Sequence, residues 1–280
     1  MPLSLSSAAL VLEPDPVPYR PDPDCAIFER DLLVRFGIGR DEGRLRQGAN
    51  IGFTELADSL IRALPIQLTS PDLLIFAFGL PDMIALKHVA QRVNYMLGGR
   101  SHCFAVSEQG LRAPFTALKV ADAFARSGRC GTLALFVCEQ NTYAYPDPFI
   151  EDNKVPNSAA LLYFDDAGRY EFHGTRMAPR GTRLGTLLDS MTAGLEPGGA
   201  LLVAGPWADA GELAGTGLPI HRTAPGPFCT GVWLDLARHH EDWSAAYRSV
   251  VLCDTDPRTG QSQAAVLRLR PTDPTHRRSS

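Results

Sequence analysis

A strand pattern runs directly into a long helix pattern between Cys103 and Gly128, in the sequence CFAVSEQGLRAPFTALKVADAFARSG. Five positions of the helix part recur at helical spacing, and one of the five is polar: Phe115, Leu118, Ala121, Asp122 and Ala125. A helix with so little polar surface on this side is expected to be buried. A buried helix that follows a strand after a tight turn is typical of a sheet with helices packed against it.

Strand and helix patterns alternate along most of the chain. Strands are predicted at Leu73–Phe78, His102–Val106, Thr132–Cys138, Ala200–Ala204, Ser249–Cys253 and Ala264–Leu269, and helices at Thr54–Leu64, Asp82–Leu97, Leu111–Arg126, Leu184–Ala193 and Gly231–Arg238. Two further strand patterns, Ala159–Phe164 and Tyr170–His173, are separated by a turn signal and predict a hairpin. The alternation favours an α/β fold with parallel strands and helices on both faces of the sheet.

Two segments fall outside this alternation. Glu13–Asp24 contains five prolines, which exclude a helix and predict an extended segment on the surface. Pro271–Ser280 is polar, and we expect it to be a disordered tail.

The composition narrows the classes of function. The chain has 280 residues, of which 45% are hydrophobic and 21% charged, as in an ordinary folded domain. Its net charge of −4 gives no reason to expect nucleic acid or an anionic membrane as partner. We expect a cytoplasmic protein, because no apolar run reaches the length of a membrane span and no signal-peptide pattern begins the chain. The cysteines lack C-x-x-C spacing and no cluster of cysteine or histidine is visible, so we expect neither a metal nor a cofactor.

The helix part of the opening segment carries a family resemblance. Its residues fit, without a gap, the run that follows the nucleophilic cysteine in the thiolase superfamily: Ala117, Leu118, Val120, Ala121, Asp122, Ser127 and Gly128. The segment most resembles β-ketoacyl-acyl-carrier-protein synthase III. The resemblance implies a thiolase-like α/β fold, with two similar halves in a five-layered arrangement. Residues 1–174 would form the first half, and residues 175–270 a shortened second half.

The same resemblance places three catalytic positions. Enzymes of that family use a cysteine thiolate to take the acyl group, and a histidine and an asparagine to assist decarboxylation and hold the enolate. Here the cysteine position falls on Leu111, the histidine position on Pro206 and the asparagine position near Gly226. None of these side chains can act as a nucleophile, move a proton or donate a hydrogen bond. The resemblance therefore implies that the condensing triad is lost.

Four residues are candidate surrogates for the missing groups: Ser107, Glu108, Gln109 and Cys229. Glu108 and Gln109 lie in the turn before Leu111, where they either face the old pocket or satisfy the backbone of the turn. Cys229 lies close to a predicted helix N-terminus, where a thiol can be activated; the alternative is a buried core residue. Pocket or interface residues are expected at Cys103, Tyr143, Tyr145 and Phe149, because a loop with several aromatic residues usually buries them.

These observations leave three readings of the function open. The first is a degenerate, non-condensing partner or chain-length-factor-like subunit of an active ketosynthase in a polyketide or fatty-acyl pathway. The second is a non-standard acyltransferase or decarboxylase that acts on an acyl thioester without the triad. The third is a scaffold that binds acyl carrier protein.

The resemblance also implies how the chain associates. Expected partners are an active ketosynthase homologue in a heterodimer or a second copy in a homodimer, with acyl carrier protein or a coenzyme A thioester as ligand. The strand His102–Val106 would pair with a partner's strand across a two-fold axis, because an apolar edge strand is a liability unless it is covered.

Overall fold

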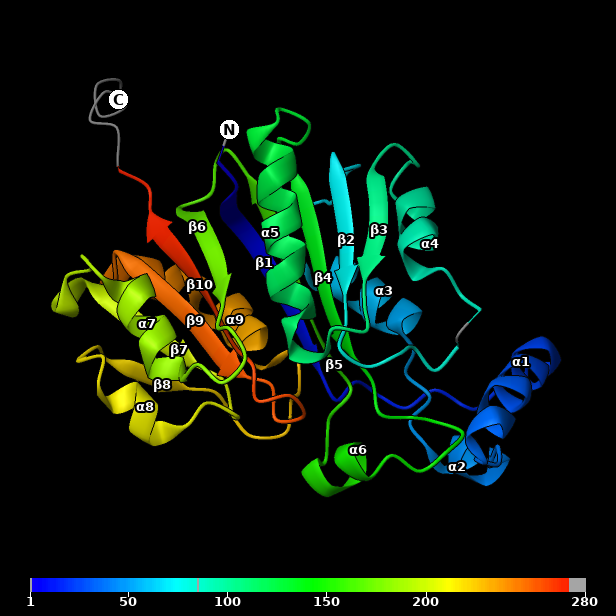
Figure 1. The fold of residues 1–280 in the computed structure, drawn as a ribbon. Coiled ribbons are helices and arrows are strands. Elements are labelled where there is room, and N and C mark those ends of the chain that lie inside the picture. Colours follow the sequence, from blue (N-terminus) through cyan, green and yellow to red (C-terminus); the bar gives the residue numbers. More distant parts are fainter. Residues whose placement is uncertain (1, 85, 272–280) are drawn as a thin grey trace.

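Ten strands form one continuous sheet in the computed structural model, which describes residues 2–84 and 86–271. The strand order is β3-β2-β4-β5-β1-β6-β10-β9-β7-β8, so β3 and β8 are the edge strands (Figure 1). The strands are β1 (Ser4–Leu12), β2 (Leu73–Ala77), β3 (His102–Val106), β4 (Leu133–Glu139), β5 (Ser158–Asp165), β6 (Tyr170–Met177), β7 (Ala200–Ala204), β8 (Ile220–Arg222), β9 (Ser249–Thr255) and β10 (Ser262–Leu269). The helices are α1 (Pro23–Leu33), α2 (Glu42–Gln47), α3 (Phe53–Ala63), α4 (Val89–Met96), α5 (Ala113–Arg126), α6 (Pro148–Asn153), α7 (Leu184–Thr192), α8 (Ala210–Ala214) and α9 (Gly231–Ala246), with single 3-10 turns η1 (Val34–Phe36), η2 (Gly110–Arg112) and η3 (Pro197–Gly199).

The sheet consists of two halves with the same internal order. In the first half β3, β2 and β4 are parallel, and β5 is antiparallel to both β4 and β1. In the second half β8, β7 and β9 are parallel, and β10 is antiparallel to both β9 and β6. The halves join through a short antiparallel contact in which Leu5 faces Tyr170. The second half, from β6 to β10, is the shorter one, as expected.

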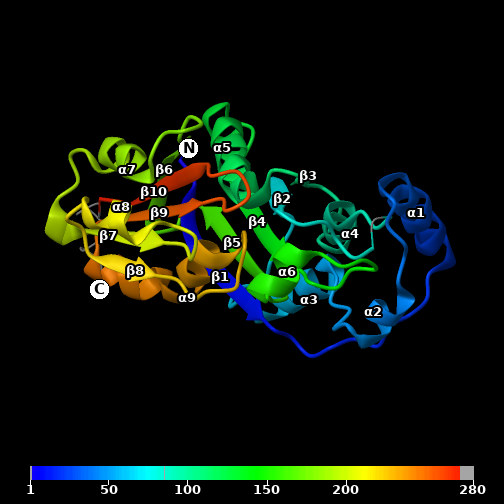
Figure 2. The same cartoon turned by 60° about the horizontal axis from the view of Figure 1, so that its bottom comes forward.

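The helices complete a five-layered arrangement. The helices α3 and α4 pack on one side of the first half, and α7 packs on the outer side of the second half. Between the halves, α5 contacts β2 and β6, and α9 contacts β1 and β9. Phe115 of α5 meets Trp233 of α9 edge-on in this central core, with ring centroids 4.9 Å apart. Figure 2 shows α7 and α8 at one end of the molecule and α1–α4 at the other. The predicted α/β fold with five layers is confirmed.

Local sequence explains three elements that the prediction placed well: β2, β4 and α5. Every residue of β2 and β4 is buried, because helices cover both faces of these parallel strands. Phe76 and Phe136 stack across them with centroids 4.5 Å apart. The helix α5 has Pro114 in its first turn, where the missing N–H has no partner to lose, and ends before Gly128, whose φ is +73°.

The predicted hairpin of Ala159–Phe164 with Tyr170–His173 is wrong. The strands β5 and β6 both pair with β1, which lies between them. A Cβ on Gly168, in the connecting turn, would lie 2.3 Å from the backbone oxygen of Ser4, so the turn accommodates the β1 backbone only because it has a glycine there. A short connection between two strand patterns favours a hairpin, but a third strand of distant sequence can separate them.

Four smaller expectations are corrected by the structure or stay predictions. The helix predicted at Asp82–Leu97 is limited to α4, and α1 begins at Pro23 inside the proline-rich segment, where Asp22 Oδ1 accepts the N–H of Cys25 at 3.0 Å. The division at residues 174/175 remains a prediction, and β6 spans it. Of the predicted tail 271–280, residues 272–280 lie outside the described residues. No helix within residues 2–84 and 86–271 is long and apolar enough to cross a membrane.

Candidate functional site

Three segments far apart in the sequence meet beyond the carboxyl ends of the parallel strands. Leu111 lies in η2 at the entry to α5, Pro206 follows β7, and Gly226 precedes α9. The indole Nε1–H of Trp207 donates to the backbone oxygen of Pro227 at 3.2 Å, which joins the second segment to the third. Ligand sites of α/β proteins usually lie at this end of the strands, so this is where a site is expected.

Aromatic side chains fill the space between these segments. Phe149 packs against Phe228 and Trp207, with centroids 4.9 Å and 5.7 Å away. The guanidinium of Arg258 lies over the ring of Phe149, 4.1 Å from its centroid, and 5.1 Å from that of Phe228. Phe228 is 1% exposed. We call Phe149, Trp207, Phe228 and Arg258 the aromatic plug.

The backbone N–H of Leu111, the residue at the predicted cysteine position, is paired with a carboxylate of the same chain. The N–H of Leu111 donates to Asp256 Oδ2 at 3.2 Å, and both residues are buried. The other oxygen of Asp256 accepts the N–H groups of Arg258 and Thr259 at 2.8 and 3.2 Å. An N–H at a helix N-terminus can stabilise the oxyanion of an acyl-transfer step, but here that donor already has an acceptor.

Glycine at position 110 makes this contact possible. Gly110 has a φ of +55°, and a Cβ there would lie 2.4 Å from Asp256 Oδ2. We therefore expect Gly110→Ala to lower the free energy of unfolding by about 3 kcal/mol, through backbone strain and displacement of the carboxylate. Urea denaturation measures it. Gly128→Ala is the matched control, because Gly128 also has a positive φ but open space around it, and it should lose about 1 kcal/mol. Equal losses would contradict the close approach.

A second buried carboxylate supports the loop before α9. Glu139, at the end of β4, accepts the N–H of Cys229 at 2.6 Å and that of Phe228 at 3.0 Å. The hydroxyl of Thr230, the residue before α9, donates to it at 3.2 Å. Burial raises the pKa of Glu139 to about 7, although the hydrogen bonds from Cys229 and Phe228 oppose the shift. Glu139 thus fixes the backbone that presents Phe228 to the plug.

A third buried carboxylate lies beneath the turn that contains Pro206. Asp254 accepts the backbone N–H of Trp207 at 3.1 Å, and a Cβ on Gly205 would lie 1.8 Å from its Oδ2. Burial raises the pKa of Asp254 to about 8, against the hydrogen bonds from Thr255 and Trp207. Sequence reasoning missed Glu139, Asp254 and Asp256. The only local feature that marks them is an acidic residue at or just after the end of an apolar strand. Their hydrogen-bond partners lie too far away in the sequence to be inferred.

The candidate surrogates are dispersed around the site. Glu108 is exposed with a φ of +58°, and Ser107 is half-buried. Gln109 Oε1 accepts the hydroxyl of Thr116 at 2.7 Å, so its side chain supports the first turn of α5. Cys229 Sγ is buried and accepts the N–H of Gly79 at 3.3 Å. Burial, and secondarily the charge of Glu139, raises the pKa of the Cys229 thiol well above its usual value, which keeps the thiol protonated at neutral pH.

The expected pocket or interface residues separate into two groups. Tyr143 is buried in its own chain and donates its hydroxyl to the backbone oxygen of Pro81 at 3.0 Å, with Tyr145 packed against it. Phe149 belongs to the aromatic plug. Cys103, by contrast, lies half-buried on the edge strand β3, where its sulfur accepts the amide of Asn94 at 3.5 Å.

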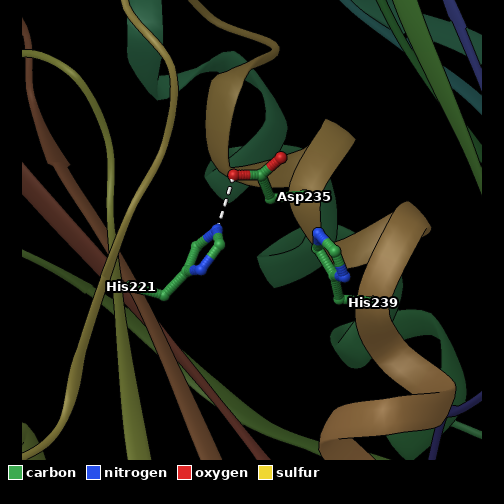
Figure 3. Close-up of side chains that lie close together, drawn as sticks. All are labelled: His221, Asp235 and His239. Atoms are coloured by element: carbon green, nitrogen blue, oxygen red, sulfur yellow. Dashed lines mark hydrogen bonds and ion pairs between the residues drawn. The ribbon is translucent and has the colours of Figure 1, made fainter.

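The structure brings together three possible metal-ligating side chains, although no such cluster is visible in the sequence. Figure 3 shows His221 from β8 beside Asp235 and His239 from α9. The candidate ligand atoms of the three residues all lie within 4.8 Å of one another. The predicted helix Gly231–Arg238 stopped before His239, whereas α9 extends to Ala246, and the sequence offered no way to place His221 beside it.

Comparisons with known proteins identify the fold. No family model and no curated protein matches the sequence. The structure of 3-oxoacyl-(acyl-carrier-protein) synthase III from Aquifex aeolicus VF5 is similar with a TM-score of 0.58 and 13% identity, over 95% of this chain and 99% of that chain. The corresponding enzyme FabH from Pseudomonas aeruginosa PAO1 gives 0.60 and 14%, over 97% and 99%. Xanthomonas campestris OleA with bound lauric acid and lauroyl-CoA gives 0.61 and 15%, over 96% and 99%. The chain therefore has the thiolase-like fold of these synthase III and OleA structures.

Proposed function

We propose that this protein is a non-condensing subunit that associates with an active ketosynthase III-like enzyme of a fatty-acyl or polyketide pathway. The observation that carries the proposal is the hydrogen bond from the Leu111 N–H to Asp256. A condensing enzyme needs a nucleophile at this turn and a free donor for the thioester oxyanion. This chain has Leu111 where the nucleophile would be, and the N–H that would serve as the oxyanion donor is already bonded to Asp256.

The aromatic plug supports the same reading. Phe228 lies beside Gly110, Phe149 packs against Phe228, and Arg258 stacks on both rings. Arg258 also lies 3.7 Å from Asp147, which keeps its charge over the rings. An acyl thioester could approach Leu111 only if these side chains moved. A filled site and a missing nucleophile are both compatible with a subunit that associates with an enzyme but does not itself catalyse the condensation.

The edge of the first half supports association. β3 pairs with β2 alone among the described strands, and most of its residues are exposed or half-exposed. Large apolar side chains are also exposed at this end of the molecule, on or beside α1 and α4 (Figure 2). Tyr95 is 84%, Phe36 71% and Val34 66% exposed. Exposed apolar side chains and an open strand edge each favour a protein partner at this end of the molecule.

The purified protein should form no covalent acyl adduct when incubated with acyl-coenzyme A or acyl-carrier-protein thioesters. Leu111 has no nucleophilic atom, and the thiol of Cys229 is buried and protonated. Intact-mass spectrometry measures the adduct. Cys103→Ser is the control, because it removes the half-buried thiol of β3 that could react without catalysis.

A stoichiometric adduct that survives Cys103→Ser would contradict the proposal. If the adduct mapped to Cys229 and disappeared in Cys229→Ser, the chain would instead be an acyltransferase with a relocated nucleophile. An adduct on Ser107 would lead to the same conclusion with a hydroxyl as the nucleophile.

A further inference from the structure

Three side chains converge at the edge of the second half, away from the aromatic plug. His221 is the middle residue of the edge strand β8, which pairs with β7 through Val203. Asp235 and His239 lie one turn apart on α9 and therefore share a face of that helix. Figure 3 shows His221 and His239 on either side of the Asp235 carboxylate, with both rings and the carboxylate turned into the same space.

We propose that His221, Asp235 and His239 bind a divalent transition-metal ion, with Zn²⁺ as the best match. Two imidazoles and one carboxylate are a ligand set that zinc uses when a fourth position is left to water or another ligand. The proposal is independent of the function proposed above, because none of these residues belongs to the plug or to the triad positions.

The distances suit such an ion after small side-chain rotations. His221 Nε2 lies 2.8 Å from Asp235 Oδ2, and the three candidate ligand atoms lie within 4.8 Å of one another. Zinc–ligand bonds of about 2.1 Å in tetrahedral geometry separate neighbouring ligand atoms by about 3.4 Å. The ion would take the place of the hydrogen bond between His221 and Asp235. From the upper bound of 4.8 Å, a pair of ligand atoms has to approach by at most about 1.4 Å, which rotation of an imidazole can supply.

The surroundings hold two of the ligands in place. Arg238 Nη1 donates to Asp235 Oδ1 at 3.2 Å, which leaves Oδ2 as the oxygen that faces His221. The ring of Trp243 packs against His221 and His239, with centroids 5.2 and 5.4 Å away. Asp235 is 7% exposed, whereas both histidines are half-buried. Metal ligands in proteins are commonly oriented by neighbouring residues that hydrogen-bond to them or pack against them. Here Arg238 holds Asp235, and Trp243 packs against both histidines.

Binding of the ion would fasten β8 to α9. The strand β8 has three residues, and among the described strands it pairs with β7 alone. A metal bridge from its middle residue to α9 would stabilise this edge of the sheet, because an ion that binds only the folded state raises its stability.

The test uses the full-length protein after treatment with a chelator and Zn²⁺ as the probe. Titration against a chromophoric zinc indicator should show one tight equivalent, and Zn²⁺ should raise the Tm. His239→Gln should lower the affinity for this zinc ion on the order of 100-fold and abolish the rise in Tm, because it removes one ligand. Glutamine is chosen because it keeps a polar side chain of similar size. Co²⁺ in place of Zn²⁺ should give the intense visible bands of four-coordinate cobalt, and His239→Gln should remove them.

His240→Gln is the matched control. His240 is the next residue of α9, but its Nδ1 lies 3.2 Å from the backbone oxygen of Ala237, so it faces its own helix. This variant should bind Zn²⁺ like the wild type. The proposal is overturned if the wild type binds no tight equivalent, or if His239→Gln and His240→Gln bind alike. Loss of stability in His221→Gln without zinc binding in the wild type would show that the three side chains only hold β8 in place.

Discussion

Replacing Glu139 by alanine should lower the free energy of unfolding by about 3–5 kcal/mol. The change removes the acceptor for the N–H groups of Phe228 and Cys229 and for the hydroxyl of Thr230, all of which are buried. Glu151→Ala is the control, because Glu151 lies exposed on α6 and pairs with Arg44 at the surface, where the loss should stay below about 0.5 kcal/mol. Similar losses in the two variants would contradict the role of Glu139.

The same carboxyl should make stability depend on pH. Its pKa is about 7 in the folded protein and near the ordinary value of about 4.3 in the unfolded chain. The folded state therefore binds the proton more tightly between these values. Its contribution to stability is fully present below about pH 4.3 and decreases as the pH rises through 7. The total decrease is on the order of 3 kcal/mol.

Glu139→Gln isolates this contribution, because glutamine keeps the shape of the protonated acid but cannot ionise. Urea denaturation at pH 5 and pH 8 should show that the wild type loses more stability than the variant as the pH rises. Asp254, with a pKa raised to about 8 by burial, adds a slope of the same sign in both proteins and cancels in the difference. Parallel pH curves would mean that Glu139 ionises alike in the folded and unfolded states.

The central elements of this fold could be predicted because their sequence pattern is local. The strands β2 and β4 are uninterrupted apolar runs, and α5 has apolar residues over most of its surface. The strand β1 was not found, because the pairing of Ala8 with Leu162 joins residues more than 150 positions apart. The sequence of Ser4–Leu12 does not by itself indicate that this strand lies between β5 and β6. The turn signal between β5 and β6 therefore led to the wrong prediction of a hairpin.

The site could be predicted only where a motif marks it. The resemblance placed Leu111 at the entry to a helix, and that helix is α5. It could not place Asp256, which reaches Leu111 across 145 positions of the chain, or Glu139, which reaches Cys229 across 90. Buried carboxylates with distant backbone partners are set by tertiary packing, so their local sequence carries little trace of them.

Association should depend on the open edge of β3, and Ala105→Glu should disrupt it. Ala105 is exposed near the end of that strand. If β3 pairs with a strand of an active ketosynthase III-like partner or of a second copy, the carboxylate would be buried without a counter-charge. Permanent interfaces of this kind bury roughly 2,000 Å² or more. We expect the variant to weaken association on the order of 100-fold or more, measured by sedimentation of the protein alone and with the partner.

Ala214→Glu provides the control, because Ala214 is an exposed alanine on α8 at the opposite end of the molecule. It adds the same charge and should leave association unchanged. Ala105→Glu should also keep the thermal stability of the isolated chain, since Ala105 is exposed there; this separates a broken interface from a misfolded subunit. A wild-type protein that sediments as a monomer, alone and mixed with an active ketosynthase III-like enzyme, would contradict the partner proposal, because the open edge of β3 and the exposed Tyr95 on α4 would then have nothing to cover them.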